Sequence, residues 1–303
     1  MAILMATYNG ACFLGEQLNS IARQQYGQWT LFVSDDGSQD DTLAIVSEAQ
    51  NSWGGGRVKW VHGPGRGFVA NFLSLACNSE INANFYAWSD QDDIWCVDKL
   101  EVAIAWLNTI PEHIPALYCG RTELICESGS YAGNSPLFSR APHFANALVQ
   151  NIGGGNTMVF NQAARALLKE AGGDVDVPSH DWWAYQLISG AGGVVYYDPC
   201  PKVLYRQHGG NLVGTNTGWA ARWSRMRMVF RGRFAEWNQR TIIALESMHH
   251  RLSPEHKITL ERFKGARNQT LLFRAINILR AGIYRQTLLG NLGLVVAVVL
   301  KKI

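Results

Sequence analysis

The sequence predicts an α/β fold built on a mostly parallel sheet and followed by a helical extension. Short apolar runs alternate with amphipathic stretches over about the first 100 residues, as in β-α-β units with right-handed crossovers. Each of these apolar runs ends in a polar turn. Beyond about residue 218, basic and apolar side chains recur at helical spacing.

The composition is that of a folded protein, with 47% hydrophobic and 17% charged residues among 303. This length suffices for one large α/β domain and an appendage. The net charge of +3 conceals an uneven distribution. Residues 1–221 hold 11 Lys and Arg against 20 Asp and Glu (−9), whereas residues 222–303 hold 16 against 4 (+12). A basic tail favours an anionic surface, either nucleic acid or the cytoplasmic leaflet of a membrane.

The individual elements follow from the spacing of apolar residues. Leu14, Leu18 and Ile21 recur as on one face of a helix, whereas continuous apolar or aromatic runs predict buried strands. The expected strands are 3–6, 29–33, 58–61 and 85–88, and the expected helices lie around 14–21, from 41, from 68 and from 98 through 107.

Residues 62–67 form a Gly-rich loop that matches neither of the common phosphate-binding fingerprints. Its glycines have the wrong spacing for a P-loop or a dinucleotide-binding turn, and it follows the third strand rather than the first. A P-loop kinase and a Rossmann dehydrogenase are therefore disfavoured.

An acidic turn containing Asp90, Asp92 and Asp93 follows the expected strand 85–88. Open α/β sheets bind ligands at the carboxyl ends of their strands. Three carboxylates in four residues repel one another unless a cation lies among them, and Mg²⁺ or Mn²⁺ suits such oxygen ligands. The alternative is a solvated acidic turn that caps the next helix.

Polar turns at 7–10 and 34–38 accompany this acidic turn, and all three follow strands. They should lie at one edge of the sheet, where carboxylates and free backbone amides favour a nucleoside-diphosphate site. Without further signals, each of them could also be an ordinary loop.

Together these segments resemble the successive motifs of family 2 glycosyltransferases with the GT-A fold. The last of them resembles the rhamnosyltransferase-like branch in particular. The resemblance covers about residues 2–215 and does not extend well into the tail. The segments that carry it are Ala6-Thr7-Tyr8-Asn9-Gly10, Ser34-Asp35-Asp36-Gly37-Ser38 with Asp40 and Thr42, and Ser89-Asp90-Gln91-Asp92-Asp93-Ile94-Trp95.

The resemblance implies three sets of site residues and a cofactor, Mn²⁺ or Mg²⁺. Asp92 and His208 would bind the metal, with Asp90 or Asp93 as a further ligand. The implied donor-binding residues are Ala6, Thr7, Tyr8, Asn9, Asp35, Asp36, Arg66, Asn71, Asp90, Gln91 and Arg206. The implied acceptor-side residues are Gly154, Asn156, His180, Trp182 and Trp183.

Asp181 is the expected catalytic base. It lies among aromatic residues, which can stack on sugar rings and raise the pKa of a carboxylate. The alternative is a helix-capping Asp, with Trp182 and Trp183 packed in the core. Its position corresponds to the family's acidic acceptor-side motif, which favours the catalytic interpretation. Residues 150–160, a Gly-dense turn before a strand, would border the same pocket.

The implied activity is inverting, metal-dependent transfer of a sugar from a nucleoside diphosphate to a hydroxyl of a growing surface polysaccharide or lipid-linked glycan. By resemblance the donor is dTDP-L-rhamnose, while UDP- or dTDP-sugars such as galactose and glucose stay open. Two other classes remain as alternatives, a nucleotidyltransferase and a non-catalytic sugar-binding protein with this fold.

The tail, residues 218–303, is expected to be a basic amphipathic helical segment that follows a catalytic domain at 1–217. In that domain the donor half is about 1–100 and the acceptor half about 101–217. Apolar and Arg residues alternate at helical spacing over 219–233, which suits a membrane interface, packing on the catalytic domain or contact with a second subunit. No nucleic-acid-binding module is recognised.

Residues 288–300 are apolar but shorter than the about 20 residues that a bilayer span needs, so a dipping anchor or a partner-packing helix is expected. The start of the chain has no signal-peptide pattern, and the six cysteines have no disulfide or zinc spacing. We therefore expect a cytoplasmic protein that is peripheral at the inner face of the plasma membrane.

Overall fold

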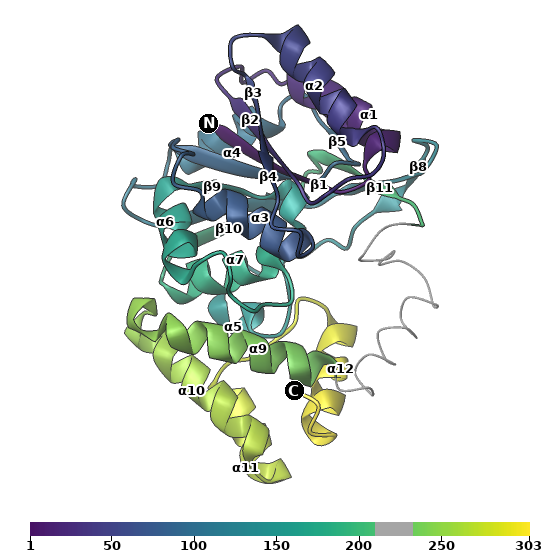
Figure 1. The fold of residues 1–303 in the computed structure, drawn as a ribbon. Helices are drawn as coiled ribbons and strands as arrows, with labels where there is room; N and C mark the ends of the chain where they lie inside the picture. The colour runs from purple at the N-terminus through teal and green to yellow at the C-terminus, as the bar shows by residue number, and fades with distance from the viewer. Residues whose placement is uncertain (210–232) are drawn as a thin grey trace.

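The computed structural model describes residues 1–209 and 233–303. In Figure 1 the α/β part, coloured purple to teal, lies above the C-terminal helices, coloured green to yellow. The predicted α/β class and the helical C-terminal extension are both confirmed.

The main sheet has seven strands in the order β10-β6-β9-β4-β1-β2-β3. Its neighbours pair in parallel, except that β9 runs antiparallel to both β4 and β6. The prediction of a mostly parallel sheet is therefore confirmed. The strands are β1 (Ala2–Thr7), β2 (Thr30–Asp35), β3 (Val58–His62), β4 (Phe85–Ser89), β6 (Ala116–Gly120), β9 (Val159–Asn161) and β10 (Val194–Asp198).

Helices cover both faces of this sheet, which explains why every residue of β1 is buried. Successive side chains of a strand point to opposite faces. Ile3 and Met5 therefore pack with α1, α2 and α4, whereas Leu4 packs with α3, α6 and α7. The helices of this part are α1 (Ala11–Ala22), α2 (Thr42–Trp53), α3 (Phe68–Cys77), α4 (Lys99–Leu107), α5 (Phe144–Ala147), α6 (Gln162–Ala171) and α7 (His180–Gly190).

The register of the strands places the three polar turns together. Thr7 at the end of β1 pairs with Asp35 at the end of β2, and Met5 of β1 pairs with Ser89 at the end of β4. Because these strands are parallel, the chain leaves all three at the same edge of the sheet.

A second, four-stranded sheet has the order β5-β11-β7-β8 and was not foreseen from the sequence. β11 runs antiparallel to β5, which directly follows the acidic turn. This pairing brings a segment more than 100 residues away along the chain back to the acidic turn. The strands are β5 (Ile94–Trp95), β7 (Glu123–Cys126), β8 (Tyr131–Asn134) and β11 (Val203–Gln207).

The C-terminal helices are α9 (Arg233–Ser247), α10 (Pro254–Asn268), α11 (Leu271–Arg280) and α12 (Leu288–Val299). They do not stand apart from the α/β part, since Leu245 of α9 and Phe263 of α10 are buried in the same apolar cluster as Phe144 of α5. The expected domain boundary at 217–218 and nearly all of the amphipathic stretch 219–233 lie outside the described residues.

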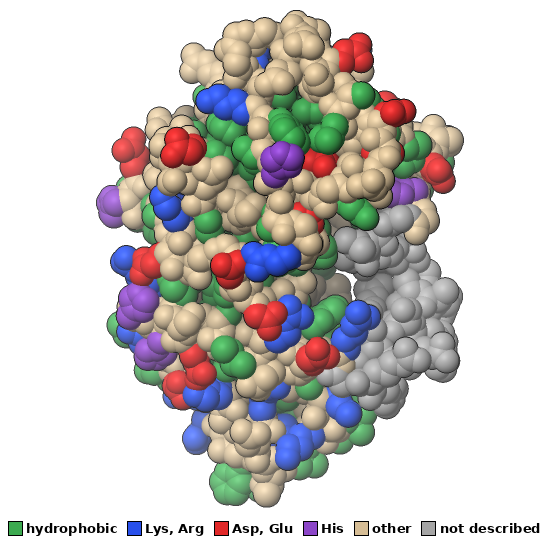
Figure 2. Space-filling view, in the orientation of Figure 1, with side chains coloured by type: hydrophobic (Ala, Val, Ile, Leu, Met, Phe, Trp, Pro, Cys, Tyr) green, Lys and Arg blue, Asp and Glu red, His purple; other side chains and the backbone are tan. Residues whose placement is uncertain are grey.

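Within residues 1–209 and 233–303, no helix is both long enough and apolar enough to cross a bilayer. The expectation that 288–300 would form a helix too short to span is thus met by α12, which has 12 residues. On the face drawn in Figure 2, Lys and Arg gather over the C-terminal helices, in line with the uneven charge of the sequence.

Candidate active site

Hydrogen bonds join the first polar turn to the second. The Thr7 hydroxyl donates to Asp35 Oδ1 at 2.8 Å, and the Asn9 backbone N–H donates to Ser38 Oγ at 2.8 Å. The backbone of Asn9 has φ 48°, a left-handed conformation that Asn tolerates better than most residues. The two turns therefore form one rigid unit at the sheet edge.

Asp35 and Asp36, both expected to contact the donor, have different surroundings. Asp35 is buried, and its carboxylate accepts four hydrogen bonds, from Thr7, Gly37 and both the N–H and the hydroxyl of Ser38. Such a carboxylate has about four acceptor sites in all, so Asp35 is saturated within the chain. Within the described part of the chain, Asp36 accepts the N–H groups of just two glycines of the 62–67 loop, at 2.7 Å each, and keeps acceptor capacity for a ligand.

Gln91 links the first polar turn to the acidic turn. Its side-chain oxygen accepts the Tyr8 N–H at 2.9 Å, and its amide nitrogen donates to the Tyr8 carbonyl at 3.0 Å. A Cβ at Gly10 would lie 2.2 Å from the same oxygen, so only glycine leaves room for Gln91 there. The Tyr8 ring is exposed and thus available to a ligand.

Three further expected donor residues lie around this edge. Ala6 is buried in β1, and Asn71 of α3 is buried and donates to the Ser34 carbonyl at 2.9 Å. Arg66 is exposed and forms an ion pair with Asp174. Asn71 thus supports the end of β2, while Arg66 lies at the surface of the same region.

In the acidic turn, Asp92 Oδ2 lies 2.8 Å from Nε2 of His208, the residue after β11. Their side chains are 20% and 17% exposed, so both are accessible from one side. The structure therefore brings together the two residues that the resemblance implied as metal ligands.

Burial and mutual repulsion raise the pKa of two other carboxyls of this turn. Desolvation, then the charges of Asp93 and Asp92, raise the pKa of Asp90 well above its usual range, even though Asp90 is partly exposed. Burial first, and then the Asp92 charge, raise the pKa of Asp93 to about 7. Asp93 is fully buried and accepts a hydrogen bond from the Asn156 amide at 2.6 Å.

Such a set of crowded, oxygen-rich groups suits a hard divalent cation. Asp92 and His208 provide one carboxylate and one imidazole, and the carboxyls of Asp90 and Asp93 follow in the same turn. These residues fit Mn²⁺ or Mg²⁺, with coordination positions left for water or diphosphate oxygens.

Arg206, expected to contact the donor, is almost fully buried and supports the acidic turn instead. Its guanidinium donates to the Asp92 carbonyl, to the Glu127 carbonyl and to the Glu16 carboxylate, and it stacks on Phe13 at 4.7 Å. Donor contact by Arg206 stays a prediction, although in this structure the side chain is enclosed by these partners. Glu16 and Phe13 were missed, since nothing in the sequence separates them from ordinary helix α1 residues.

Lys99, at the first position of α4, was also missed. Its side chain is fully buried, with the ammonium 3.2 Å from the centre of the Trp95 ring and without a hydrogen-bond partner among the described residues. Its charge lowers the pKa of Asp90 and Asp93, and burial lowers its own pKa. The sequence did contain a signal for Lys99, since this charged residue occupies a position that the amphipathic pattern of α4 would bury.

Asp181 lies in the first turn of α7 and is held by three hydrogen bonds. Its Oδ1 accepts the Ser179 hydroxyl at 2.6 Å and the Trp182 N–H at 2.7 Å, and its Oδ2 accepts the Gly155 N–H at 3.0 Å. Asn156, the residue after Gly155, donates from its side-chain amide to Asp93 of the acidic turn at 2.6 Å. The consecutive residues Gly155 and Asn156 thus join Asp181 to the acidic turn. The expected base and the acidic turn therefore share one site.

His180 and the Gly-dense turn form the wall beside Asp181. The His180 ring is buried and stacks on Phe72 at 4.0 Å; burial lowers its pKa to about 4 and keeps it neutral. Neither ring nitrogen has a hydrogen-bond partner in the described part of the chain. The turn becomes the short 3₁₀ helix η1 (Gly155–Thr157), and a Cβ at Gly155 would lie 2.5 Å from His180 Nε2. Gly154 precedes this helix.

Trp182 and Trp183 do not offer aromatic faces to a sugar. Trp182 is 6% exposed and donates from its indole to the Ala147 carbonyl at 2.6 Å, while Trp183 is 1% exposed. Their expected role in acceptor binding stays a prediction, although α7 turns both side chains into the core in this structure. The alternative interpretation, core packing, describes them better.

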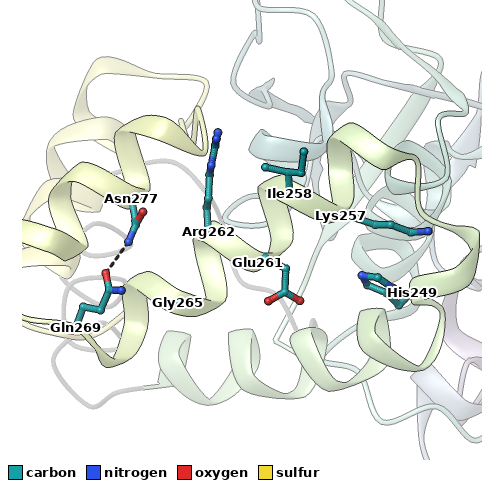
Figure 3. A pocket seen from close by; sticks show the side chains of 8 residues that line it. All are labelled: His249, Lys257, Ile258, Glu261, Arg262, Gly265, Gln269 and Asn277. Atoms are coloured by element: carbon teal, nitrogen blue, oxygen red, sulfur yellow. Dashed lines mark hydrogen bonds between the residues drawn. The ribbon is translucent and has the colours of Figure 1, made fainter.

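Two cavities lie away from this edge, in the C-terminal part. One of about 540 Å³ is lined by residues of α10 and α11, including Lys257, Glu261 and Asn277 (Figure 3). Another of about 620 Å³ lies beside His143, Glu255 and His256, whose ligand atoms fall within 4.8 Å of one another.

This His143 group does not suit a cation. Nδ1 of His143 already accepts the Ala145 N–H, and three arginines, Arg140, Arg262 and Arg280, line the same cavity. Their positive charge disfavours a metal ion, so neither cavity competes with the acidic edge as the catalytic site.

Comparison with known proteins agrees with the motifs. The model of glycosyl transferase family 2 matches residues 2–171. The chain is 32% identical over 237 residues to the dTDP-rhamnosyl transferase RfbG of Shigella flexneri, covering 74% of this chain and 78% of that protein. It is 30% identical over 125 residues to the UDP-Glc:alpha-D-GlcNAc-diphosphoundecaprenol beta-1,3-glucosyltransferase WfgD of Escherichia coli, covering 41% and 46%.

Solved structures show the same fold. TarS of S. aureus in complex with UDP-GlcNAc aligns with a TM-score of 0.53 at 17% identity, covering 93% of this chain and 92% of that one. The mannosyltransferase PcManGT of Pyrobaculum calidifontis, in complex with GDP-Man and Mn²⁺, aligns with a TM-score of 0.52 at 18% identity, covering 99% and 86%. The chain therefore belongs to glycosyl transferase family 2, and it is a glycosyltransferase with the GT-A fold.

Proposed function

We propose that this enzyme transfers L-rhamnose from dTDP-L-rhamnose, with inversion of the anomeric configuration, to a hydroxyl of a growing glycan. The observation that supports the mechanism is the position of Asp181, which accepts three hydrogen bonds, one of them from Gly155, the neighbour of the Asn156 that donates to Asp93 of the acidic turn. The name of the Shigella flexneri relative supports rhamnose as the sugar. Glucose or galactose donors remain the second candidates, since the Escherichia coli relative is named for UDP-glucose.

In this mechanism Asp181 accepts the proton of the acceptor hydroxyl. The acceptor oxygen forms its bond to the anomeric carbon from the face opposite the diphosphate, while the bond from that carbon to the diphosphate oxygen breaks and its electron pair stays on the diphosphate. A single displacement of this kind inverts the anomeric centre. General-base catalysis of this type contributes about 10²–10⁴-fold in rate.

The remaining residues bind and orient the donor. Asp92 and His208 would hold Mn²⁺ or Mg²⁺, which when bound stabilises the charge that develops on the leaving diphosphate. Between Asp35 and Asp36, the unsaturated Asp36 is the better candidate to contact the base or ribose. The turn at Thr7, Tyr8 and Asn9 would line the same pocket, with Arg66 near its rim. Gly154 and Asn156 would border the acceptor side.

The acceptor is proposed to be a surface polysaccharide or a glycan under assembly on a lipid, made at the inner face of the plasma membrane. The C-terminal part would bring the enzyme to that surface or join two copies of the chain. The relative named for a diphosphoundecaprenol acceptor supports a lipid-linked substrate.

A panel of nucleotide sugars with Mn²⁺ tests the proposal. We expect release of dTDP from dTDP-L-rhamnose to exceed release of nucleotide from UDP-glucose or UDP-galactose, and NMR of the product to show the opposite anomeric configuration from the donor. A faster reaction with a UDP-hexose would reassign the donor, and retention of configuration would contradict the role of Asp181.

A further inference from the structure

Helix α12 is apolar on every side. Apart from Asn291 and two glycines, Leu288–Val299 consists only of Leu, Val and Ala. A helix of this composition is normally buried all round. Only one side of α12 is buried here: Leu294, Ala297 and Val298 pack against the rest of the molecule, and the Arg274 guanidinium donates to the Val298 carbonyl at 2.6 Å.

The other side of α12 is an exposed stripe of large apolar side chains. Its members follow one another at helical spacing and are 42–86% exposed. This exposed stripe consists of Leu288, Leu289, Leu292, Val295, Val296, Val299 and Leu300. On α11, Leu272, Phe273 and Leu279 are exposed as well, at 68%, 60% and 79%. Apolar surface gathered in this way usually marks an interaction site.

Basic residues lie on both sides of α12 along the chain. Lys301 and Lys302 follow α12 directly, and Arg280, exposed, precedes it at the end of α11. Across residues 233–303 there are 12 Lys and Arg against 4 Asp and Glu. An apolar stripe with a cationic border matches the acyl chains and anionic headgroups of a bilayer surface.

A second copy of the chain fits this stripe less well. Twelve residues of helix are about 18 Å long, and a helix with side chains is about 10 Å wide, so two such stripes would cover each other over only a few hundred Å². A stable interface takes about 800 Å² from each partner. Two copies would also bring two strongly basic regions together, which repel each other. A helix of this length is also too short to cross the about 30 Å of hydrocarbon in a bilayer, so α12 would have to lie along the membrane surface.

We propose that α12 lies in the surface of an anionic bilayer, with the exposed stripe among the acyl chains and Arg280, Lys301 and Lys302 at the lipid phosphates. This membrane contact rests on the proposed function, because a lipid-linked acceptor would be presented at the same bilayer surface. The contact is α12, and the partner is a membrane rather than a second subunit.

Co-sedimentation of the full chain with vesicles tests this proposal. Vesicles of phosphatidylcholine with phosphatidylglycerol are compared with vesicles of phosphatidylcholine alone. The test variant carries Leu292→Glu and Val296→Glu on the exposed stripe. Its matched control carries Leu137→Glu and Ile243→Glu, which change the charge equally at sites that are 52% and 57% exposed elsewhere. Point variants replace deletion of the tail, because α9 and α10 share the core of the α/β part.

We expect the wild type and the control to bind the phosphatidylglycerol vesicles, and the α12 variant to need at least about tenfold more lipid for half-maximal binding, since each buried Leu or Val is worth about that factor. Salt should weaken wild-type binding, because it screens the headgroup charge. Thermal unfolding followed by circular dichroism verifies that the variants are folded. Donor hydrolysis in solution, without vesicles, reports on the proposed function separately.

Three results would overturn the proposal. The α12 variant could bind vesicles as tightly as the wild type, or the control could lose binding equally, which would make the effect one of charge alone. The wild type could instead ignore vesicles and form a dimer by light scattering that the α12 variant breaks, which would assign the stripe to a second copy. Loss of donor turnover with intact vesicle binding would contradict the proposed function and leave this inference standing.

Discussion

The proposed donor side and the proposed acceptor side of the site differ in how closely their parts are packed. On the donor side, side chains such as Asp35 and Gln91 bond to backbone groups of neighbouring turns and are satisfied within the chain. On the acceptor side, Gly155 lies in close contact with the His180 ring, whose two nitrogens have no hydrogen-bond partner in the described residues.

Both sides therefore contain hydrogen-bonded carboxylates and a buried polar atom without a partner in the described residues, Asn71 Oδ1 on the proposed donor side and the His180 nitrogens on the proposed acceptor side. What differs is the packing, because only the proposed acceptor side adds the close contact between Gly155 and the His180 ring. A buried polar atom without a partner costs about 1–3 kcal/mol. Such a cost at His180 is understandable if a substrate hydroxyl or a water supplies the missing bond. Variants that alter one side only therefore test whether the two sides act separately.

The largest effect is expected from Asp181→Asn, which keeps the shape of the side chain and removes the base. Because general-base catalysis is lost, kcat should fall about 10²–10⁴-fold, while the Kd of the donor nucleotide, measured by calorimetry with Mn²⁺, should stay within twofold, or about 0.4 kcal/mol. Asp176→Asn is the matched control, since the Asp176 side chain is 74% exposed and forms an ion pair with Arg240 at the surface. An equal loss of donor affinity would place Asp181 on the donor side instead.

Asp92→Ala should act on the opposite side of the site. If Asp92 holds the proposed metal ion at the leaving diphosphate, the substitution should lower kcat/KM about 10²–10³-fold and weaken Mn²⁺-dependent binding of the nucleoside diphosphate. EDTA should have the same effect on the wild type, and added Mn²⁺ should reverse it. A wild-type rate that EDTA leaves unchanged would remove the metal from the mechanism.

Gly155→Ala probes the close packing of the acceptor side. The new Cβ would lie 2.5 Å from His180 Nε2 and 3.3 Å from Asp181 Cβ, so the first turn of α7 must shift. A displacement near 1 Å can cost about 10²-fold in rate, and we expect a loss of that order in kcat with little change in donor binding. Gly15→Ala on α1 has open space around its Cβ and should leave kcat unchanged.

A smaller effect concerns the stability of the metal-free protein as a function of pH. Burial raises the pKa of Asp93 to about 7 in the folded protein, above the value of about 3.9 for an exposed Asp. The folded state therefore binds the proton more tightly, so this contribution to stability is full below pH 4 and is lost as the pH rises through 7.

Urea unfolding at several pH values measures this slope. In EDTA, the free energy of unfolding should decline between pH 5 and pH 8, and Asp93→Asn should flatten that decline. With saturating Mn²⁺ the trend should weaken or reverse, because ionised carboxylates bind the metal. A decline of equal slope in the wild type and Asp93→Asn would show that another group titrates.

Much of the donor side could be predicted from the sequence because it depends on local order. Strands β1, β2 and β4 each show as a short apolar run ended by polar residues, and parallel pairing brings such ends to one edge. The acidic turn with Asp92 and the family itself followed from contiguous motifs, whereas His208 came only from the resemblance. Contiguous motifs can be recognised in a sequence because their residues stand next to one another and interact with near neighbours or with one shared ligand.

Other features became visible only in the tertiary structure. They concern residues that are distant in sequence, or side chains whose orientation a short motif does not fix. The antiparallel pairing of β11 with β5 carries Arg206 under the acidic turn, where it is enclosed by Glu16 and Phe13 of α1. Burial of Trp182 and Trp183, and exposure of α12, depend likewise on which helix faces meet. The chemistry of a side chain determines what it can bind. Its neighbours, however, are determined by packing among segments that are distant in sequence, and a local sequence pattern does not predict them.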